Sequence, residues 1–495
     1  MGLAAGAGIA AGVVAVVFRV FVDKIEEITH QASSSLSAVM FVLFGAIAGG
    51  LAGWLTERFC PEGGGSGIPQ TKAAILGIRP MRARRVLPIK LGAGLLALAS
   101  GMSLGREGPT IHMGAATADL FGEMVRAPRR TRRTLLAAGA GAGLAAAFNA
   151  PLAGFLFVME EMRREMSPTT YGTALVGSVV AVGVARLALG QAPSFSLSEP
   201  SPIPLSAYWA VGIVGVVAAL LGVAFNRLLL LGLAVRTRLK ISRAVAGAIV
   251  GAASVLLLII APQLGGGGHG LAETALNGGL TSISITVLGL LLIGKLLATV
   301  ASYATGVPGG IFAPLLAMGA LAGLVTGRLL HLAVPGLEAS PQILATLGMA
   351  ATLSSAVRAP LTSVVLIIEM TGQYHHLFAL MGASFVAYLG AELLHDEPIY
   401  EALFHRDLKR NDVPEEHEGE VIELFVEPGA SWEGRRIATL GMAKGLTIAT
   451  IERDGKVIAP GGDTVIRSGD HLTIVLGAAT PRSAITGLMA GVEAP

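Results

Sequence analysis

The hydrophobic positions of the chain gather into long stretches without a charged side chain. Six of them run 22 to 32 residues without Asp, Glu, Lys or Arg: 28–56, 134–159, 200–226, 244–272, 296–327 and 370–391. Roughly 20 apolar residues in a helix span the hydrocarbon of a bilayer. Together with apolar segments near 1–18, 90–105, 166–185 and 277–294, the pattern predicts about ten helices that cross a membrane.

Helix-breaking residues interrupt several of these stretches at membrane depth. Gly, Pro and Asn occur in 146-AAFNAPLAG-154 and in 306-GVPGGIFAPLL-316, for example. A break leaves backbone N–H and C=O groups without helical partners, which is tolerated only where the break is buried in protein or lines an aqueous cavity. We therefore expect broken helices around an internal pathway.

The last 84 residues have a different composition. Residues 412–495 carry 13 acidic and 7 basic side chains, whereas residues 1–411 carry 20 acidic and 29 basic. Beyond a polar linker at 406–420, short alternating runs indicate strands at 421–427, 446–452, 456–459 and 472–476, and Asp454-Gly455 is a hairpin-turn signal. The sequence predicts an all-α polytopic membrane domain over 1–405, followed by a small soluble α+β domain over 421–490.

Composition narrows the class of protein. The 495 residues are 53% hydrophobic and 14% charged, with a net charge of +3. These values exclude an ordinary soluble protein, a disordered chain and a nucleic-acid binder. The single Cys60 excludes an intramolecular disulfide. The N-terminal apolar stretch lacks the basic region of a signal peptide, and similar segments follow it, so we expect a multi-pass integral membrane protein.

Basic side chains gather in three clusters that bear on orientation. They are Arg79, Arg82, Arg84 and Arg85; Arg126, Arg129, Arg130, Arg132 and Arg133; and Arg406, Lys409 and Arg410. The positive-inside bias indicates that the third cluster and the soluble domain beside it are cytoplasmic. The sequence does not place the first two clusters, because the number of crossings before them is open.

The membrane part contains an internal repeat. Residues 141–160 match 350–369 at an offset of 209, so that Pro151 and Glu160 recur as Pro360 and Glu369. Residues 105–122 match 310–327 at an offset of 205. Two duplicated halves, about 1–190 and 205–405, with breaks in corresponding places are typical of a transporter whose site lies at the repeat interface. The sequence alone leaves the relative direction of the halves open.

Three Gly-rich turns that contain proline precede apolar helices: 63-GGGSGIP-69, 105-GREGP-109 and 309-GGIFAP-314. A helix start presents backbone N–H groups and the positive end of the helix macrodipole. Several such ends meeting in the membrane form an anion site without a full positive charge, which would hold the ion too tightly to let it pass. One turn alone is more often an ordinary helix start. Three turns, two of them related by the repeat, favour a site.

Acidic residues near these segments have several interpretations. Glu107 lies in the second turn, and an acid in an apolar membrane segment is functional by default. Its carboxylate can occupy the anion site and leave on protonation; the alternative is a carboxylate that caps its own helix at the membrane surface. Glu160 and its repeat partner Glu369 are interpreted as structural. Glu161 stays open between an interfacial acid–base cluster and a functional acid.

These motifs, in this order, resemble the CLC family of chloride channels and proton–chloride antiporters. The resemblance covers roughly residues 1–405 and is carried by GSGIP, GREGP, AAFNAPLAG followed by VMEEM, GGIFAP, APLTSVVLIIEMT and EPIY. It implies two inverted-topology halves and a homodimer with one anion pathway per subunit. Serine in GSGIP, rather than methionine, argues against the fluoride-exporting branch, and the absence of proline there argues against a nitrate preference.

The resemblance also implies roles for individual residues. Ser66 and Gly67 of GSGIP, Ile311 and Phe312 of GGIFAP, and Tyr400 of EPIY correspond to positions that contact the bound chloride. Glu107 corresponds to the gating glutamate. Glu161, the second acid of VMEEM, corresponds to the internal proton-transfer glutamate, a residue associated with exchangers rather than channels.

The tail resembles a different family, the C-terminal subdomain of RCK/TrkA potassium-transport regulators. The similarity runs over 421–476 and is most distinctive at the closing 469-GDHLT-473. It implies a small dimerising domain that senses an unknown small ligand. The alternative is a domain that only stabilises the dimer, because ligand-linked switching requires a difference in affinity between two states.

The expected function is secondary active exchange of chloride for protons, with no metal, nucleotide or other cofactor. One rival is a passive, voltage- or proton-gated chloride channel of the same fold. A second rival is an intramembrane serine protease, since Gly64-Gly65-Ser66-Gly67 fits the GxSG string of rhomboid enzymes and His112 or His269 is available as a base. That string is weak in a Gly-rich chain, and a protease leaves the duplicated halves unexplained.

Overall fold

The computed structural model describes residues 1–35, 37–163, 168–195, 203–410, 421–442, 445–453 and 456–477. The chain folds into two compact units, Met1–Asp407 and Leu408–Pro495. Each unit is described by itself.

Helices joined by loops make up the described part of the first unit, and the last of them, α17, continues past Asp407 to Arg410. Up to residue 195 its α-helices are α1 (Gly2–Ser35), α2 (Ala38–Phe59), α3 (Ile68–Ile75), α4 (Ala83–Ala99), α5 (Glu107–Met124), α6 (Arg129–Phe148), α7 (Pro151–Phe157) and α8 (Pro168–Leu189), with a π-helical segment at Val158–Arg163. From residue 203 they are α9 (Tyr208–Arg238), α10 (Arg243–Ile260), α11 (His269–Leu276), α12 (Ile285–Ala304), α13 (Phe312–Ala333), α14 (Pro341–Val357), α15 (Pro360–Thr371), α16 (Leu377–Leu393) and α17 (Ile399–Arg410).

Eight helices among the described residues are long and apolar enough to cross a membrane, where the sequence pattern predicted about ten. The uncharged stretches and the helices do not coincide. Five of the six stretches contain a break: 28–56 after Ser35, 134–159 at Asn149, 244–272 after Ile260, 296–327 after Ala304 and 370–391 after Thr371. Absence of charge marks an apolar environment but does not require a continuous helix, so an uncharged stretch is not equivalent to one crossing.

The two copies of the repeat break at equivalent residues. Asn149 ends α6 and Arg358 ends α14, both with a left-handed backbone (φ 58° and 66°), and each is followed by Ala-Pro and a new helix. Proline at the first helical position needs no N–H partner, which favours the restart. The expected broken helices are therefore present in both copies.

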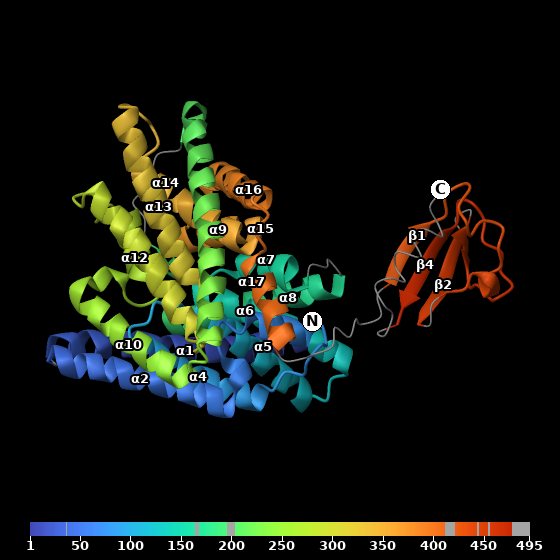
Figure 1. The fold of residues 1–495 in the computed structure, drawn as a ribbon, viewed down its shortest axis with the longest axis horizontal. Helices are drawn as coiled ribbons and strands as arrows, with labels where there is room; N and C mark the ends of the chain where they lie inside the picture. Colours follow the sequence, from blue (N-terminus) through green and yellow to red (C-terminus); the bar gives the residue numbers. More distant parts are fainter. Residues whose placement is uncertain are drawn as a thin grey trace. The chain divides into compact units, whose positions relative to one another are not determined.

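Helices α5, α6, α13 and α14 form the interior of this unit, and most of their side chains are buried. In the view of Figure 1, α9 stands upright beside α12, α13 and α14, while α1 and α2 lie across the lower part. Helices α2 and α10 pack together through glycines: a methyl group on Gly45 would lie 2.6 Å from the carbonyl oxygen of Gly251. Small residues of this kind allow helix backbones in a membrane to approach closely.

The second unit contains a four-stranded antiparallel sheet of order β1-β4-β2-β3. Its strands are β1 (Val421–Phe425), β2 (Leu446–Arg453), β3 (Lys456–Ile458) and β4 (His471–Leu476), which confirms the strands predicted from the alternating pattern. Asp454-Gly455 lies outside the described residues, but Arg453 and Lys456 on either side are paired. Between residues 421 and 477 the described helical structure is one 3-10 turn, Ile437–Thr439, so the helical part of the expected α+β domain is not seen there.

Candidate anion-binding site

Backbone hydrogen bonds join the three Gly-rich turns inside the first unit. Gly105 and Gly310 exchange N–H···O bonds of 2.8 and 2.7 Å. Gly65 donates to Val307 at 3.0 Å and accepts from Gly309 at 3.0 Å. Segments about 200 residues apart in the sequence are therefore bonded to one another at main-chain level. The anion hypothesis required this convergence.

The turns approach so closely that only glycine fits at their meeting point. A methyl group on Gly108 would lie 2.9 Å from both Cα and Cβ of Ser66 and 3.0 Å from Cα of Gly310, distances shorter than real side chains adopt. Ser66, the start of α5 and the loop that leads into α13 thus lie in direct contact.

The helix starts at this junction are buried, and the side chains of their N-cap residues do not cap them. Gly67, Arg106 and Ile311 are the N-cap residues of α3, α5 and α13, and none of them forms a capping hydrogen bond through its side chain. The first N–H groups of a helix have no partner within it. Three positive helix ends in a buried place favour an anion there.

Two hydroxyl groups lie at the same place. Ser66 is buried, and its Oγ accepts hydrogen bonds from the N–H of Ile68 (3.3 Å) and the hydroxyl of Tyr303 (3.5 Å), which leaves its own hydrogen to donate. Tyr400 is buried with its ring stacked on Phe312, at 5.8 Å between centroids. The hydroxyl of Tyr400 has no hydrogen-bond partner among the described residues. A buried hydroxyl without a protein partner is costly, so a ligand that accepts its hydrogen fits here.

Glu107 is the first residue of α5 and is 3% exposed. Its carboxylate folds against the backbone of Gly105. This burial argues against the alternative in which Glu107 caps its helix at the membrane surface, because the break in the chain carries the start of α5 into the interior of the unit.

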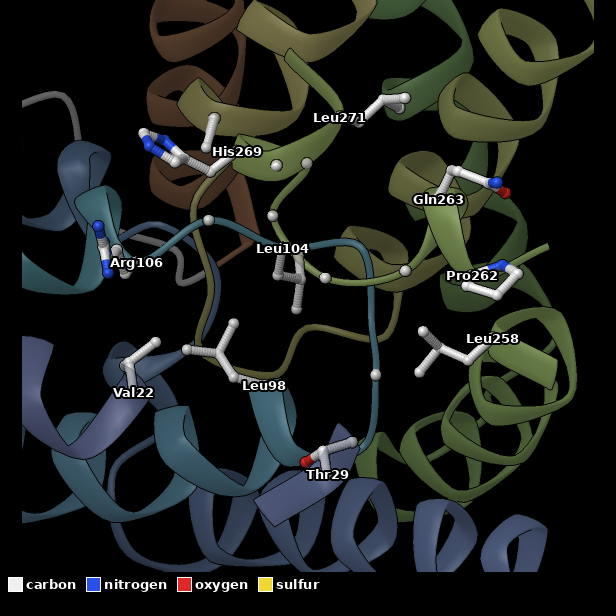
Figure 2. Close-up of a pocket in the computed structure, with 18 of the residues that line it drawn as sticks. Val22, Thr29, Leu98, Leu104, Arg106, Leu258, Pro262, Gln263, His269 and Leu271 are labelled. Carbon is white, nitrogen blue, oxygen red and sulfur yellow. The ribbon is translucent and has the colours of Figure 1, made fainter. Parts of the chain in front are cut away.

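A cavity of about 720 Å³ leads to this carboxylate. Glu107, Gly105 and Leu104 line it, together with the loop Gly265–Gly268. Figure 2 shows Arg106 and His269 on one side of this cavity and Leu258, Pro262 and Gln263 on the other. Glu107 thus lies between the joined turns and a path to the outside of the unit.

Glu161 is 1% exposed and lies 3.5 Å from the ammonium nitrogen of Lys72. This is a buried ion pair, not the interfacial cluster that the sequence left open. Its neighbour Glu160 points elsewhere and accepts hydrogen bonds from the backbone at the start of α15. Glu369 likewise accepts hydrogen bonds from the backbone at the start of α7. The structural interpretation of Glu160 and Glu369 is thus confirmed, and Glu161 has a different environment.

Sequence reasoning missed a pair of buried lysines. Lys90 Nζ donates to the carbonyls of Gly63 (2.9 Å) and Gly65 (2.7 Å), and Lys295 Nζ donates to those of Leu264 (3.1 Å) and Gly266 (2.7 Å). Each lysine holds the loop that precedes a short helix, α3 or α11. The signal was present: the two lysines are 205 residues apart, the offset of the second repeat, and stand in otherwise apolar segments. Tyr303 gave no such signal, because its contact with Ser66 spans 237 residues.

Neither histidine considered for a protease forms a hydrogen bond with Ser66 in the described part of the chain. Both ring nitrogens of His112 lack a hydrogen-bond partner among the described residues, and Nε2 of His269 lies 3.1 Å from the carbonyl oxygen of Ser194. A serine nucleophile requires a base within hydrogen-bond reach. The geometry around Ser66 therefore gives no support to hydrolysis.

The structure brings members of the first two basic clusters together. Arg79 of the first cluster pairs with Asp407, next to the third cluster, at 3.0 Å. A pocket of about 420 Å³ is lined by Arg79 and by members of the second cluster: Arg129, Arg132 and Arg133. The sequence could not place the first two clusters; the structure brings Arg79 of the first next to members of the second and pairs it with Asp407, the neighbour of Arg406.

Broken apolar helices that converge on a buried polar site define a class of protein, the polytopic membrane proteins that move ions. The chain belongs to the family described as "Voltage gated chloride channel", whose sequence profile matches residues 48–392. A second profile, the "TrkA-C domain", matches residues 421–479. Both families named by resemblance are thereby confirmed.

Curated relatives and solved structures agree with this assignment. The chain is 38% identical over 431 residues to the H(+)/Cl(-) exchange transporter ClcA of Vibrio parahaemolyticus, covering 83% of this chain and 92% of that protein. It is 34% identical over 428 residues to ClcA of Salmonella agona, covering 83% and 89%. Among structures it resembles a slow cyanobacterial Cl-/H+ antiporter, with a TM-score of 0.79, 34% identity and coverage of 83% and 98%. A eukaryotic CLC transporter, at 22% identity and a TM-score of 0.69, shares the fold.

Proposed function

We propose that this protein is a secondary active transporter that exchanges chloride for protons across a membrane. The observation that carries the proposal is the buried junction of Ser66, Gly108 and Gly310, beside the carboxylate of Glu107. An anion and this carboxylate compete for the same positive helix ends. Relatives named as H(+)/Cl(-) exchange transporters share the membrane part of the chain, which supports the same substrates here.

In this proposal chloride binds without its water shell. The N–H groups at Gly67, Ile311 and Phe312 face the ion, and the hydroxyls of Ser66 and Tyr400 donate to it. Partial charges from many groups hold the ion weakly enough for it to leave, as conduction requires. The helix starts, which their N-cap side chains do not cap, and the unpartnered Tyr400 hydroxyl support these assignments.

Protons act on the two glutamates. Protonation removes the charge of Glu107, so that its side chain leaves the positive helix ends and chloride can move. Glu161 relays protons between the cytoplasmic side of the membrane and Glu107, by a route separate from that of the anion. The burial of both acids and the ion pair of Glu161 with Lys72 support roles inside the protein rather than at its surface.

The wider organisation is part of the proposal. We place two inverted-topology halves at about 1–190 and 205–405 in a homodimer with one anion pathway per subunit. The linker over 406–420 and the domain over 421–490 lie on the cytoplasmic side, which the position of Arg79 beside Asp407 and members of the second basic cluster supports. The C-terminal domain regulates transport through a small ligand.

Reversal potentials test the proposal. Purified protein in planar bilayers is exposed to chloride and pH gradients that are varied independently. An exchanger gives a reversal potential that moves with pH at fixed chloride, and chloride driven down its gradient moves protons uphill. A reversal potential that follows chloride alone identifies a passive channel and overturns the exchange mechanism.

A further inference from the structure

A buried lysine links the candidate proton-transfer glutamate to a second acid. Lys72 Nζ lies 3.5 Å from Oε1 of Glu161 and 2.5 Å from Oε2 of Glu401 in α17. Because one ammonium group contacts both carboxylates, the three side chains form a single cluster with the acids on either side of one nitrogen. Tyr400 precedes Glu401 on the same helix, so the cluster adjoins the candidate anion site.

Solvent exposure falls in steps along a chain of side chains that ends at Glu161. Nε2 of His405 lies 3.6 Å from Oε1 of Glu401. The exposed fractions of the side chains are 49% for His405, 19% for Glu401, 6% for Lys72 and 1% for Glu161. The chain thus connects solvent with the interior through groups that bind protons or hold charge.

Other charged and aromatic groups frame this route. Glu397 lies 2.7 Å from Nδ1 of His405, on the solvent side. Asp407 of α17 pairs with Arg79, so this route opens on the face that carries Arg79 of the first basic cluster. The ring of Phe404 lies 5.8 Å from the ammonium of Lys72 and covers one side of the cluster.

The net charge of the cluster favours the binding of one additional proton. Two carboxylates and one ammonium have a net charge of −1, and an uncompensated charge inside a protein is costly. One proton on either acid makes the cluster neutral. Transfer of that proton from Glu401 to Glu161 leaves the net charge unchanged, so movement across the cluster requires no new buried charge.

We propose that Glu401 takes up protons from this face through His405 and passes them to Glu161, with Lys72 as a positioning residue that keeps its own hydrogens. The proton binds a ring nitrogen of His405, moves to the carboxylate of Glu401 and then to that of Glu161, which restores each donor for the next cycle. This inference rests on the proposed exchange function, since a proton route serves only an exchanger.

The test compares variants of the full chain in liposomes under a chloride gradient. In Glu401→Gln, proton flux falls at least fivefold while chloride flux changes less than twofold, and the reversal potential moves toward the chloride equilibrium value. Glu401→Asp keeps a carboxylate and retains at least half of the wild-type proton flux, which a merely structural role of the side chain would not explain.

A matched control lies on the same helix. Asp407 is a half-buried acid that pairs with Arg79, and Asp407→Asn leaves the proton flux within twofold of wild type. An equal loss of proton flux in Asp407→Asn and Glu401→Gln overturns the specific route through Glu401.

Glu161→Gln, measured in parallel, separates failure of this inference from failure of the proposed function. If Glu161→Gln stops proton movement and Glu401→Gln retains more than half of it, exchange stands and the role of Glu401 is wrong. If Glu161→Gln still moves protons, the proposed mechanism itself is wrong. Should Glu401→Gln fail to fold, His405→Gln at the exposed end carries the test, with at least a threefold loss of proton flux expected and unchanged flux contradicting the route.

Discussion

Glu160 and Glu369 cap each other's helices. Glu369, near the end of α15, accepts hydrogen bonds from Leu152 (3.1 Å) and Ala153 (2.8 Å) at the start of α7. Glu160, just after α7, accepts from Leu361 (3.1 Å) and Thr362 (2.7 Å) at the start of α15. Each carboxylate thus lies at the positive end of the other repeat's helix, where an anion is stabilised.

Loss of either cap should destabilise the fold. Glu160→Ala or Glu369→Ala leaves N–H groups at a helix start without partners, which costs about 1–2 kcal/mol. We expect both variants to unfold at a lower temperature than wild type in detergent, by similar amounts. Glu338→Ala, at an exposed loop position, is the control and should unfold at the same temperature as wild type. Wild-type stability in both cap variants would show that the reciprocal bonds contribute nothing.

Glu107→Gln should uncouple the two ions. The amide matches the shape of a protonated carboxyl but cannot lose a proton, so it no longer competes as an anion for the helix ends. Chloride flux in liposomes should persist while proton movement under a chloride gradient stops. Proton pumping at the wild-type rate in this variant would contradict the gating role.

Gly108→Ala should close the junction of the three turns. The added methyl would lie 2.9 Å from two atoms of Ser66, and the opposing backbone is fixed by hydrogen bonds. We expect chloride flux to fall at least tenfold. Gly92→Ala in α4 is the matched control, because nothing lies within 4 Å of its methyl group, and its flux should remain at the wild-type level. Equal flux in the two variants would show that the close approach is not part of the pathway.

Lys90 and Lys295 offer a comparison between the repeats. Both are buried and hold a loop through its carbonyls, but the loop of Lys90 carries Ser66. Lys90→Met should lower stability and also weaken chloride binding, measured by calorimetry, whereas Lys295→Met should lower stability alone. Matching chloride affinities in the two variants would contradict a role of Lys90 in positioning the anion loop.

Asp470 makes the stability of the C-terminal domain depend on pH in the acid range. Its buried carboxylate accepts two hydrogen bonds of 2.7 Å from Arg453 and one of 2.8 Å from the backbone N–H of Arg467. Burial alone would raise the pKa of Asp470, but these bonds outweigh it and hold the pKa below its usual value. The stabilisation is therefore present above the pKa of the unfolded chain, about 3.9, and is lost as the pH falls through the lower folded-state pKa.

Fluorescence of Trp432, which is buried in this domain, can follow its unfolding once Trp54 and Trp209 are replaced by Phe. The free energy of unfolding should decrease as the pH falls from about 4. In Asp470→Asn this decrease should be absent. A variant with the same pH dependence as wild type would assign the effect to another acid.

Local sequence patterns predicted the parts of this fold that depend on residues close together in the sequence. The strand at Leu446–Arg453 follows from alternation, and the helix starts at Ile68, Glu107 and Phe312 follow from Gly-Pro turns. The repeat led to the structural interpretation of Glu160 and Glu369. The same acid occurs at the same position of both copies, which favours a role in the scaffold that the two copies share.

Contacts between distant segments were out of reach of the same reasoning. Nothing near Lys72 indicates that its ammonium lies between Glu161 and Glu401, since these residues are 89 and 329 positions away. The lengths of the helices were out of reach for a related reason: hydropathy does not reveal where a helix ends within an apolar stretch, as α10 does at Ile260 and α12 at Ala304.

The bonds between Gly105 and Gly310 are made by main-chain atoms, which every amino acid shares. Their geometry constrains the glycines but leaves most other positions free to drift. Substitutions elsewhere in the chain that keep this backbone in place therefore leave the bonds of the junction unchanged.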